Sequence, residues 1–517
     1  MASAAAASPP PLFATISGSD RMLATVAVML ATLMQVLDTT IANVALPHMQ
    51  TSLQATPESI NWVLTSYIVA SAMAIPITGW LADRVGRKPL FIWTVIGFTA
   101  ASVLCAVAQN MPEMVLFRAL QGVCGAFILP LSQSVLFDVN PPQNHAKAMA
   151  MFGGGVVIGP ILGPVLGGWL TDSFDWRWVF LINLPIGALT LLMLMRFLPG
   201  GSTVRRRFDL FGFTLLAIAV GGLQLMLDRG EQVDWFQAWE IWIELGIAIS
   251  AGWMFVVHML TAREPIFDPK MFKDRNFALG ILFMAVLGLL LMAGLALLPP
   301  LLQRLMGYSV LGSGFLTAPR GVGTLLSMMV VGRLSGKVDA RLLILTGLSV
   351  MALSLWQMSH FSLQMDSRPV IISGLVQGVA LGFLFVPLNT LAFGTLEARF
   401  RTSAASILTL SRSLGGSIGI SIVTALLSRN LQVSHSDLAA NVEMSRLPAN
   451  IPVVGDPTGL SGQTVLAFID AEINRQAAMI AYIDDFHLMM IVTLCAMPLL
   501  LLLRRPRSSG GPAVIAD

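Results

Sequence analysis

Two oppositely charged residues lie inside long apolar stretches of this sequence, where charge is rare. Asp38 interrupts the stretch at 22–46, and Arg118 interrupts the stretch at 113–137. At about 1.5 Å of helix per residue, the two side chains fall at similar depths. A charged side chain at the centre of a membrane helix costs about 2.5–3.5 kcal/mol on insertion scales, so it needs a partner or water. We therefore expect Asp38 and Arg118 to pair.

Such a pair is suited to proton chemistry. Contact with Arg118 keeps Asp38 ionised, whereas separation in a drier state favours the protonated carboxyl. Protonation neutralises a buried charge and favours one of two helix arrangements, which couples proton binding to a conformational change. The alternative is a static ion pair that only fixes helix packing.

A short segment between two apolar stretches combines glycines with charges. Its glycines allow close turns or helix contacts, its aspartate can cap a neighbouring helix, and its second arginine can hold that aspartate in place. The segment predicts a latch on a cytoplasmic gate; the alternative is a basic loop that only sets membrane orientation. The gate residues are Gly79, Asp83, Arg84, Gly86 and Arg87.

The apolar stretch at 148–171 carries too many glycines and prolines for a stiff helix, because each removes a side chain or a backbone hydrogen bond. They permit bending and close packing, and generic packing of small residues is the plainer alternative. The residues assigned to this hinge or packing role are Gly155, Gly159, Pro160, Gly163, Pro164, Gly167 and Gly168.

A binding site for varied apolar molecules combines Met and aromatic surface with a few polar anchors. Arg412 is the most suggestive anchor, because an arginine inside an apolar stretch needs a second ion pair or a ligand contact. A single Met or Phe in such stretches is more often core or lipid-facing. The candidates for substrate binding are Met34, Gln35, Asn43, Trp62, Tyr67, Gln121, Gln133, Gln377, Asn389, Phe393 and Arg412.

The composition indicates that lipid is the main solvent of this chain. Of its 517 residues, 55% are hydrophobic and 11% are charged, and the mean hydropathy is +0.77, whereas a globular domain is about 25% charged. A net charge of +3 is too small for this length to suggest nucleic-acid binding. We predict an all-α polytopic membrane protein. The expected spans are 22–46, 60–81, 89–109, 113–137, 148–171, 177–198, 210–229, 238–260, 276–300, 311–332, 342–360, 369–394, 404–428 and 484–503.

Fourteen spans place both termini on one side of the membrane. Most of the 31 Lys and Arg residues fall on that side, so the positive-inside rule predicts that both termini are cytoplasmic. Between the last two spans lies a long polar connection at 429–483, which predicts a solvated periplasmic loop with a helical stretch at 465–480, or a docking surface for a periplasmic partner.

An internal repeat indicates how the spans are grouped. The segment GWLADRVGRK at 79–88 follows the second span, and a degraded copy, GRLSGKVDAR at 332–341, follows the tenth. An offset of eight helices indicates two six-helix bundles with two helices inserted between them. The predicted divisions are a cytoplasmic tail at 1–21, a first bundle at 22–198, inserted helices at 199–275, a second bundle at 276–504 and a cytoplasmic tail at 505–517.

Four segments together resemble the signature set of the major facilitator superfamily. They are LDTTIANVALP at 37–47, GWLADRVGRK at 79–88, RALQG at 118–122 and GVVIGPILGPVLGG at 155–168, in the family's order and spans. With fourteen spans, and with LPLSQS at 129–134 and LDRG at 227–230, the chain resembles the EmrB/QacA branch of drug:proton antiporters, on the EmrB side. The resemblance covers essentially the whole chain.

The resemblance implies a proton-coupled exporter of hydrophobic or amphipathic compounds in a bacterial inner membrane, working by alternating access. The motif at 155–168 supports export over uptake only by this analogy. No cofactor is expected, because the proton is the coupling ion. No Walker loop or catalytic triad pattern is found in the sequence, so an enzyme is not expected. The alternatives are an exporter or uptake permease for one metabolite, or a membrane receptor or scaffold that does not transport.

EmrB-like proteins are associated with a periplasmic adaptor of the EmrA type and an outer-membrane channel. The resemblance therefore implies these partners, in addition to drug-like substrates and the lipid bilayer, and the connection at 429–483 has room for an adaptor. No nucleic-acid partner is expected.

Overall fold

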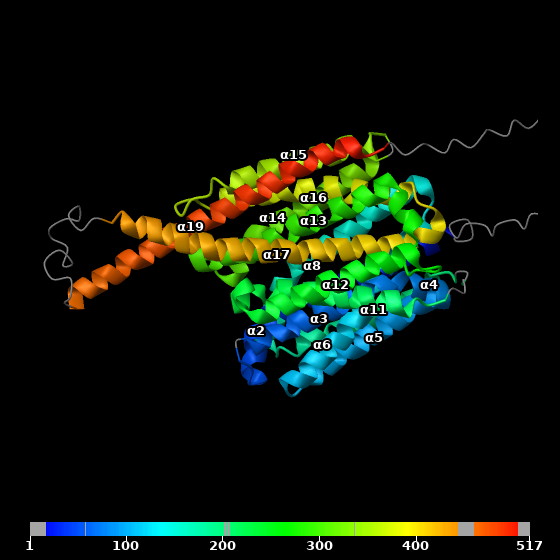
Figure 1. The fold of residues 1–517 in the computed structure, drawn as a ribbon, viewed down its shortest axis with the longest axis horizontal. Helices are drawn as coiled ribbons and strands as arrows, with labels where there is room; N and C mark the ends of the chain where they lie inside the picture. The colour runs from blue at the N-terminus through cyan, green and yellow to red at the C-terminus, as the bar shows by residue number, and fades with distance from the viewer. Residues whose placement is uncertain are drawn as a thin grey trace, which may run out of the picture.

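The described part of the computed structural model comprises residues 17–56, 58–200, 203, 207–335, 337–442 and 460–504. Within it, fourteen helices are long and apolar enough to cross a membrane, which confirms the predicted number of spans. The predicted tails at 1–16 and 505–517, Gly336 of the repeat and the middle of the connection at 429–483 lie outside the described residues. In Figure 1, α2 (Gly18–Ser52) begins and α19 (Leu460–Ala496) ends at the same end of the bundle. We call this the terminal end, and the opposite end the distal end.

The first six spans differ from the prediction mainly where a helix is interrupted. The second span bends at a short 3-10 turn, Ile75–Ile77, because Pro76 cannot donate a backbone hydrogen bond. The fourth span is interrupted after Gly125. The helices after α2 are α3 (Trp62–Ala74), α4 (Thr78–Val85), α5 (Arg87–Val107), α6 (Met111–Gly125), α7 (Ile128–Val139), α8 (His145–Ser173), α9 (Trp178–Leu181) and α10 (Asn183–Phe197).

The remaining eight spans are long single helices, most of them ending within a few residues of the predicted boundaries. The ninth continues into a π-helical turn, η7, at Leu301–Leu305. These helices are α11 (Leu210–Arg229), α12 (Trp239–Thr261), α13 (Arg275–Pro300), α14 (Val310–Leu334), α15 (Ala340–Met358), α16 (Arg368–Gly394), α17 (Arg401–Ala440) and α19.

Two six-helix bundles face each other through corresponding helices. Along one side of the interface α8 packs against α14, and along the other α17 packs against α4 and α7. Large apolar side chains fill the contact between α8 and α16, where the rings of Phe152 and Phe385 stack with centroids 6.1 Å apart. One hydrophobic core therefore extends from one bundle into the other.

The two inserted helices have different surroundings. α11 lies between the bundles: Gln224 donates to Ser417 of α17 at 2.7 Å, and Asp228 accepts from Thr65 of α3. α12 packs on α11, and Arg229 of α11 pairs with Glu240 of α12 at 2.6 Å. Most of α12 is exposed, which is expected of a helix that faces lipid.

The predicted loop at 429–483 is largely helical. α17 continues to Ala440 and α19 begins at Leu460, and both run past the bundle at its distal end (Figure 1). A helix of 40 residues is about 60 Å long, twice the thickness of the hydrocarbon layer. His435 and Asp470 join the two arms at 3.0 Å. The predicted helical stretch at 465–480 is confirmed. The prediction of a loop is wrong for 429–440, where polar residues continue the α17 helix. Hydropathy could not indicate this helix, because its residues are polar.

The glycines of α8 act mainly as contact surface. α8 is continuous through Pro160 and Pro164, so no break marks a hinge. A Cβ on Gly159 would lie 2.5 Å from Cγ1 of Val36, and one on Gly163 would collide with Thr40. The two helices are close enough for Thr40 to donate to the carbonyl oxygen of Gly159 at 3.3 Å. Close packing of small residues therefore accounts for these positions.

The other motif positions on α8 are less crowded. A Cβ on Gly167 would lie 3.3 Å from Ile41, a Cβ on Gly155 would lie 3.9 Å from Met29, and Gly168 has open space around it. The motif thus contains tight and open positions on the same helix.

We expect Gly159→Ala to destabilise the protein and Gly168→Ala to leave it unchanged or slightly more stable. At either position alanine adds about 1 kcal/mol to the stability of the helix compared with glycine. Only Gly159→Ala also forces α2 and α8 apart, which lowers the free energy of unfolding by about 1–3 kcal/mol. Melting temperatures of the two purified variants measure the difference. Equal melting temperatures would show that the contact between α2 and α8 yields without cost.

Candidate functional site

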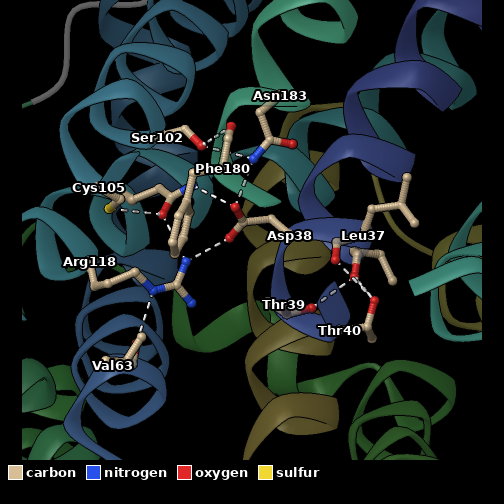
Figure 2. Close-up of polar contacts among 12 residues, drawn as sticks. Leu37, Asp38, Thr39, Thr40, Val63, Ser102, Cys105, Arg118, Phe180 and Asn183 are labelled. Atoms are coloured by element: carbon tan, nitrogen blue, oxygen red, sulfur yellow. Dashed lines mark hydrogen bonds and ion pairs between the residues drawn. The ribbon is translucent and has the colours of Figure 1, made fainter. Parts of the chain in front are cut away.

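Asp38 and Arg118 form an ion pair inside the first bundle. Arg118 Nη1 lies 2.7 Å from Asp38 Oδ2, and neither side chain is exposed to solvent. The other carboxylate oxygen, Oδ1, accepts from Gln121 at 2.8 Å and from Asn183 at 2.7 Å. Figure 2 shows the carboxylate between Arg118 on one side and Asn183 on the other. The ionised form of Asp38 is therefore fully supplied with donors from α6 and α10.

The guanidinium of Arg118 is fixed by three neighbouring groups. Its Nε donates to the carbonyl oxygen of Val63 on α3 at 2.9 Å, and Nη1 also donates to Gln121 at 2.8 Å. Its central carbon lies 4.4 Å from the centre of the Tyr67 ring, a distance at which a cation is attracted to the ring face. Nη2 is buried without a hydrogen-bond partner. One donor of the arginine thus stays available for a further acceptor.

Two polar residues of this site were missed by the sequence analysis. Asn183 Nδ2 donates both to Asp38 and, at 2.9 Å, to Ser102 Oγ. Ser102 in turn donates to the carbonyl oxygen of Phe180 at 2.9 Å. The only signal in the sequence is that each is a small polar residue inside an apolar span, and such residues are common in membrane helices.

The arrangement is compatible with both interpretations given in the sequence analysis. Each charge of the pair compensates the other, so loss of either one would leave its partner as an uncompensated buried charge. A pair that separates in another conformation would be the expected proton switch, whereas a pair that stays together would only fix helix packing.

At the terminal end, the first turn of α17 closes against the first bundle. Ser134 of α7 and Thr402 share a hydrogen bond of 2.9 Å. A Cβ on Gly79 of α4 would collide with Ser403, so glycine is needed there. Gly86 has φ of +96° between α4 and α5, a conformation that favours glycine. Both predicted glycines therefore occupy positions that require glycine.

The charges of the gate include a partner that the sequence analysis did not select. Arg87 interacts electrostatically with Asp83 and forms an ion pair with Asp138 of α7. Arg401 of α17 reaches the carboxylate of Asp138 at 3.1 Å. Arg84 is exposed and Asp83 is half-buried on α4. Asp138 thus joins the two bundles, and it lies too far along the chain for spacing to identify it as the partner.

Arg412 borders a small cavity between the bundles. The cavity has a volume of about 20 Å³, room for about one water molecule, and is otherwise apolar, with Leu287, Leu291, Met328 and Phe385 among its walls. Arg412 Nη1 is buried and has no hydrogen-bond partner among the described residues, and the guanidinium carbon lies 5.8 Å from the centre of the Phe385 ring. Arg412 therefore presents an unpaired donor between the two bundles.

The other substrate candidates do not gather around this cavity. Tyr67 and Gln121 belong to the Asp38 network. Phe393 packs against Phe137 with ring centres 4.6 Å apart. Met34, Gln35, Gln133, Gln377, Asn389 and Phe393 are buried, whereas Asn43 and Trp62 are exposed.

Arg320 of α14 is a second buried arginine of the second bundle, to which the sequence analysis gave no role. It is 7% exposed, and its Nη2 lies 3.5 Å from the carbonyl oxygen of Leu291, itself a wall of the cavity. Neither Arg320 nor Arg412 forms an ion pair with another described residue. The second bundle thus holds two largely buried arginines, of which Arg412 lines the cavity between the bundles.

Across the described ranges, no group of three or more His, Cys, Asp or Glu side chains is placed to hold a metal ion. The titratable side chain at the centre of the site is Asp38, which contacts Arg118, and the Tyr67 ring lies against Arg118.

Two six-helix bundles with two inserted helices, and an ion pair buried inside the first bundle, define a membrane transporter. The chain belongs to the Major Facilitator Superfamily, whose family model matches residues 28–420. It is 35% identical over 500 residues to the multidrug export protein EmrB of Escherichia coli strain K12, which covers 96% of this chain and 98% of that protein. It is also 35% identical over 504 residues, with the same coverage, to the fatty acid resistance protein FarB of Neisseria gonorrhoeae.

A solved structure shows the same fold. The proton:xylose symporter XylE, bound to 6-bromo-6-deoxy-D-glucose, superposes with a TM-score of 0.60 over 92% of this chain and 95% of that chain, at 15% identity. The family and the fold class predicted from the motifs are confirmed.

The contacts of Asp138 generate a prediction for the terminal end. Asp138→Asn weakens both ion pairs of Asp138. If these ion pairs stabilise the closed form of the terminal end by about 1.4 kcal/mol, the fraction of molecules in which this end is open rises about tenfold. The readout is the rate at which Ser403→Cys reacts with a maleimide, in a background in which the free cysteines Cys105, Cys124 and Cys495 are replaced.

The matched control is Asp175→Asn, which removes the exposed ion pair with Arg177. We expect it to leave the labelling rate unchanged. The same rate in Asp138→Asn and in the parent would show that Asp138 does not hold this end closed.

Proposed function

We propose that this protein exports hydrophobic or amphipathic drug-like compounds from the cytoplasm or inner leaflet in exchange for protons. The observation that carries the proposal is the fully buried Asp38–Arg118 pair in a major facilitator fold. The names of the relatives, multidrug export protein and fatty acid resistance protein, support export of apolar compounds. The similarity extends over nearly the whole of both chains, so it includes the inserted helices.

In this proposal Asp38 is the proton-coupling residue and Arg118 is its switchable partner. In the observed conformation the carboxylate of Asp38 is paired with the guanidinium of Arg118. A rearrangement that separates the two side chains leaves the carboxylate unpaired, and a proton then neutralises it. Binding and loss of this proton favour different arrangements of the bundles, which is the coupling that exchange requires.

Alternating access then requires the terminal end to open and close. We assign this gate to Gly79, Asp83, Arg84, Gly86 and Arg87, together with Asp138 and the first turn of α17. In the observed conformation the gate is held closed by the ion pairs of Asp138 and by the contact of Gly79 with Ser403. In α8, Gly159, Gly163 and Gly167 provide the surface on which α2 packs during this change. The remaining residues of the motif are assigned to bending or packing of α8, and they are Gly155, Pro160, Pro164 and Gly168.

The proposed substrate path lies between the bundles, past Arg412. An unpaired guanidinium in an apolar cavity favours compounds that combine an acidic group with an apolar body. The remaining candidates, Met34, Gln35, Asn43, Trp62, Tyr67, Gln121, Gln133, Gln377, Asn389 and Phe393, are proposed to contact substrate only when the bundles separate further.

We further propose that the protein lies in the bacterial inner membrane with its terminal end in the cytoplasm. The excess of Lys and Arg on that side supports this orientation. The distal arms of α17 and α19 then project into the periplasm, where they offer a surface for an adaptor of the EmrA type and, beyond it, an outer-membrane channel. No cofactor other than the coupling proton is needed.

The proposal predicts proton-driven extrusion of lipophilic dyes from cells or proteoliposomes. The native protein extrudes members of a dye panel that includes ethidium, and a protonophore stops the extrusion. Asp38→Asn abolishes extrusion with normal membrane insertion, because an amide cannot exchange a proton. The exposed Asp172→Asn serves as the control and keeps the native rate.

Pumping against a gradient by Asp38→Asn would place the coupling site elsewhere. If the native protein moves none of the panel, an exporter of one metabolite or a scaffold becomes the better interpretation.

Arg412 gives a separate prediction about substrate preference. Arg412→Ala lowers extrusion of dyes with a carboxylate or sulfonate at least tenfold, since a hydrogen bond to a charged group is worth about 1.5–3 kcal/mol. Arg412→Lys keeps the positive charge and retains most of the activity, and cationic dyes lose less in both variants. Equal loss for acidic and cationic dyes would indicate a structural role for Arg412.

A further inference from the structure

Asp485 is a buried carboxylate used by neither the central ion pair nor the gate. It lies on α19, its side chain is 1% exposed, and neither carboxylate oxygen has a hydrogen-bond partner in the part of the chain that the structure describes. The adjacent residue, Asp484, is exposed. Two neighbouring aspartates thus occupy opposite environments, and Asp484 provides a matched reference for Asp485.

Among the described residues of the surrounding elements, none places a positive charge in contact with Asp485. α19 packs against α13, α15, α17 and η7. The charged or titratable residues of those elements are Arg275 on α13, Arg304 on η7, Arg341 on α15, and Arg401, Arg412, Arg429, His435 and Asp437 on α17. None of them donates a hydrogen bond to Asp485 within the described part of the chain. Along α19 itself the neighbours are Tyr482, Asp484 and His487, and the charge of Asp484 disfavours a second negative charge beside it.

Asp485 lies toward the distal end of the second bundle. Roughly 28 Å of helix separates it from Leu503 at the terminal end, close to the full thickness of the hydrocarbon layer. The next residue, Phe486, packs edge-on against Phe361, with ring centres 6.0 Å apart. Phe361 follows α15 just past the distal end of that helix. This contact independently places Asp485 near the distal end of the second bundle. Water of the distal compartment is thus the nearest source of a proton.

A buried ionised carboxylate without donors is far less stable than the neutral acid, because it has lost its water and gained no partner. We propose that Asp485 is a second proton-binding site, in the second bundle, and that it holds its proton in this conformation. The proposal does not depend on what the transporter exports. It makes the second bundle sensitive to the proton concentration at the distal side.

The first test is the melting temperature of the purified protein as a function of pH. In the folded protein the proton on Asp485 is retained, whereas in the unfolded chain the carboxyl ionises freely. Native stability is therefore greatest at low pH. It falls by about tenfold in the folding equilibrium per pH unit once the carboxyl of the unfolded chain has ionised, because unfolding then releases one proton, and the fall ends where the folded protein also loses this proton. Asp485→Asn is neutral at every pH and of similar shape, so we expect it to be at least as stable as the native protein and to lack this fall. Asp484→Asn keeps the fall.

Infrared difference spectra between acidic and alkaline samples give a second readout that requires neither transport nor unfolding. The carbonyl band of a protonated carboxylic acid in an apolar site is present in the native protein and in Asp484→Asn, and absent in Asp485→Asn. Two results overturn the proposal. One is an Asp485→Asn variant that is strongly destabilised at neutral pH and recovers when Arg304→Gln is added, which would reveal an ion pair. The other is an unchanged carbonyl band and an unchanged pH dependence in Asp485→Asn.

Discussion

The burial of one aspartate and one arginine inside a membrane helix bundle is the constraint on which the first bundle depends. Neither charge can reach water, so every donor and acceptor around them must come from the protein. Asp38 on α2 takes its partners from α6 and α10, and Arg118 takes a carbonyl oxygen from α3. The pair therefore fixes four helices relative to one another, and loss of either charge would leave the other buried and unpaired, at a cost of about 3–5 kcal/mol.

Contacts lead from this pair to the terminal end and to the interface between the bundles. The segment of α3 that accepts from Arg118 bends at Pro76 into α4, whose Gly79 touches the first turn of α17 at the terminal end. The other face of α3 contacts Asp228 of α11, and α11 is bonded to α17 further along. One helix thus adjoins the ion pair, the gate and the inserted helix, which provides a contiguous route by which a change at Asp38 can reach the interface.

The parts that could be predicted from the sequence are those with a strong local signal. A charge in an apolar stretch is conspicuous, so Asp38 and Arg118 were identified, and the hydropathy pattern gave the spans. Partners such as Asn183 and Asp138 cannot be predicted in this way. A small polar residue or an aspartate at a helix end has the same local sequence pattern whether or not it contacts a residue far along the chain. The polar distal part of α17 carries no apolar signal, and buried Met and Phe side chains do not distinguish a substrate path from ordinary core.

The central claim is that Asp38 exchanges its proton when substrate binds. The most direct measurement is the number of protons taken up from or released into weakly buffered solution when a transported dye is added to the purified protein, comparing the native chain with Asp38→Asn. We predict that the number of bound protons changes by up to one more per bound dye in the native protein than in Asp38→Asn, which still binds the dye. Equal proton exchange by the two proteins, at equal dye binding, would contradict the account and reduce the Asp38–Arg118 pair to a structural element.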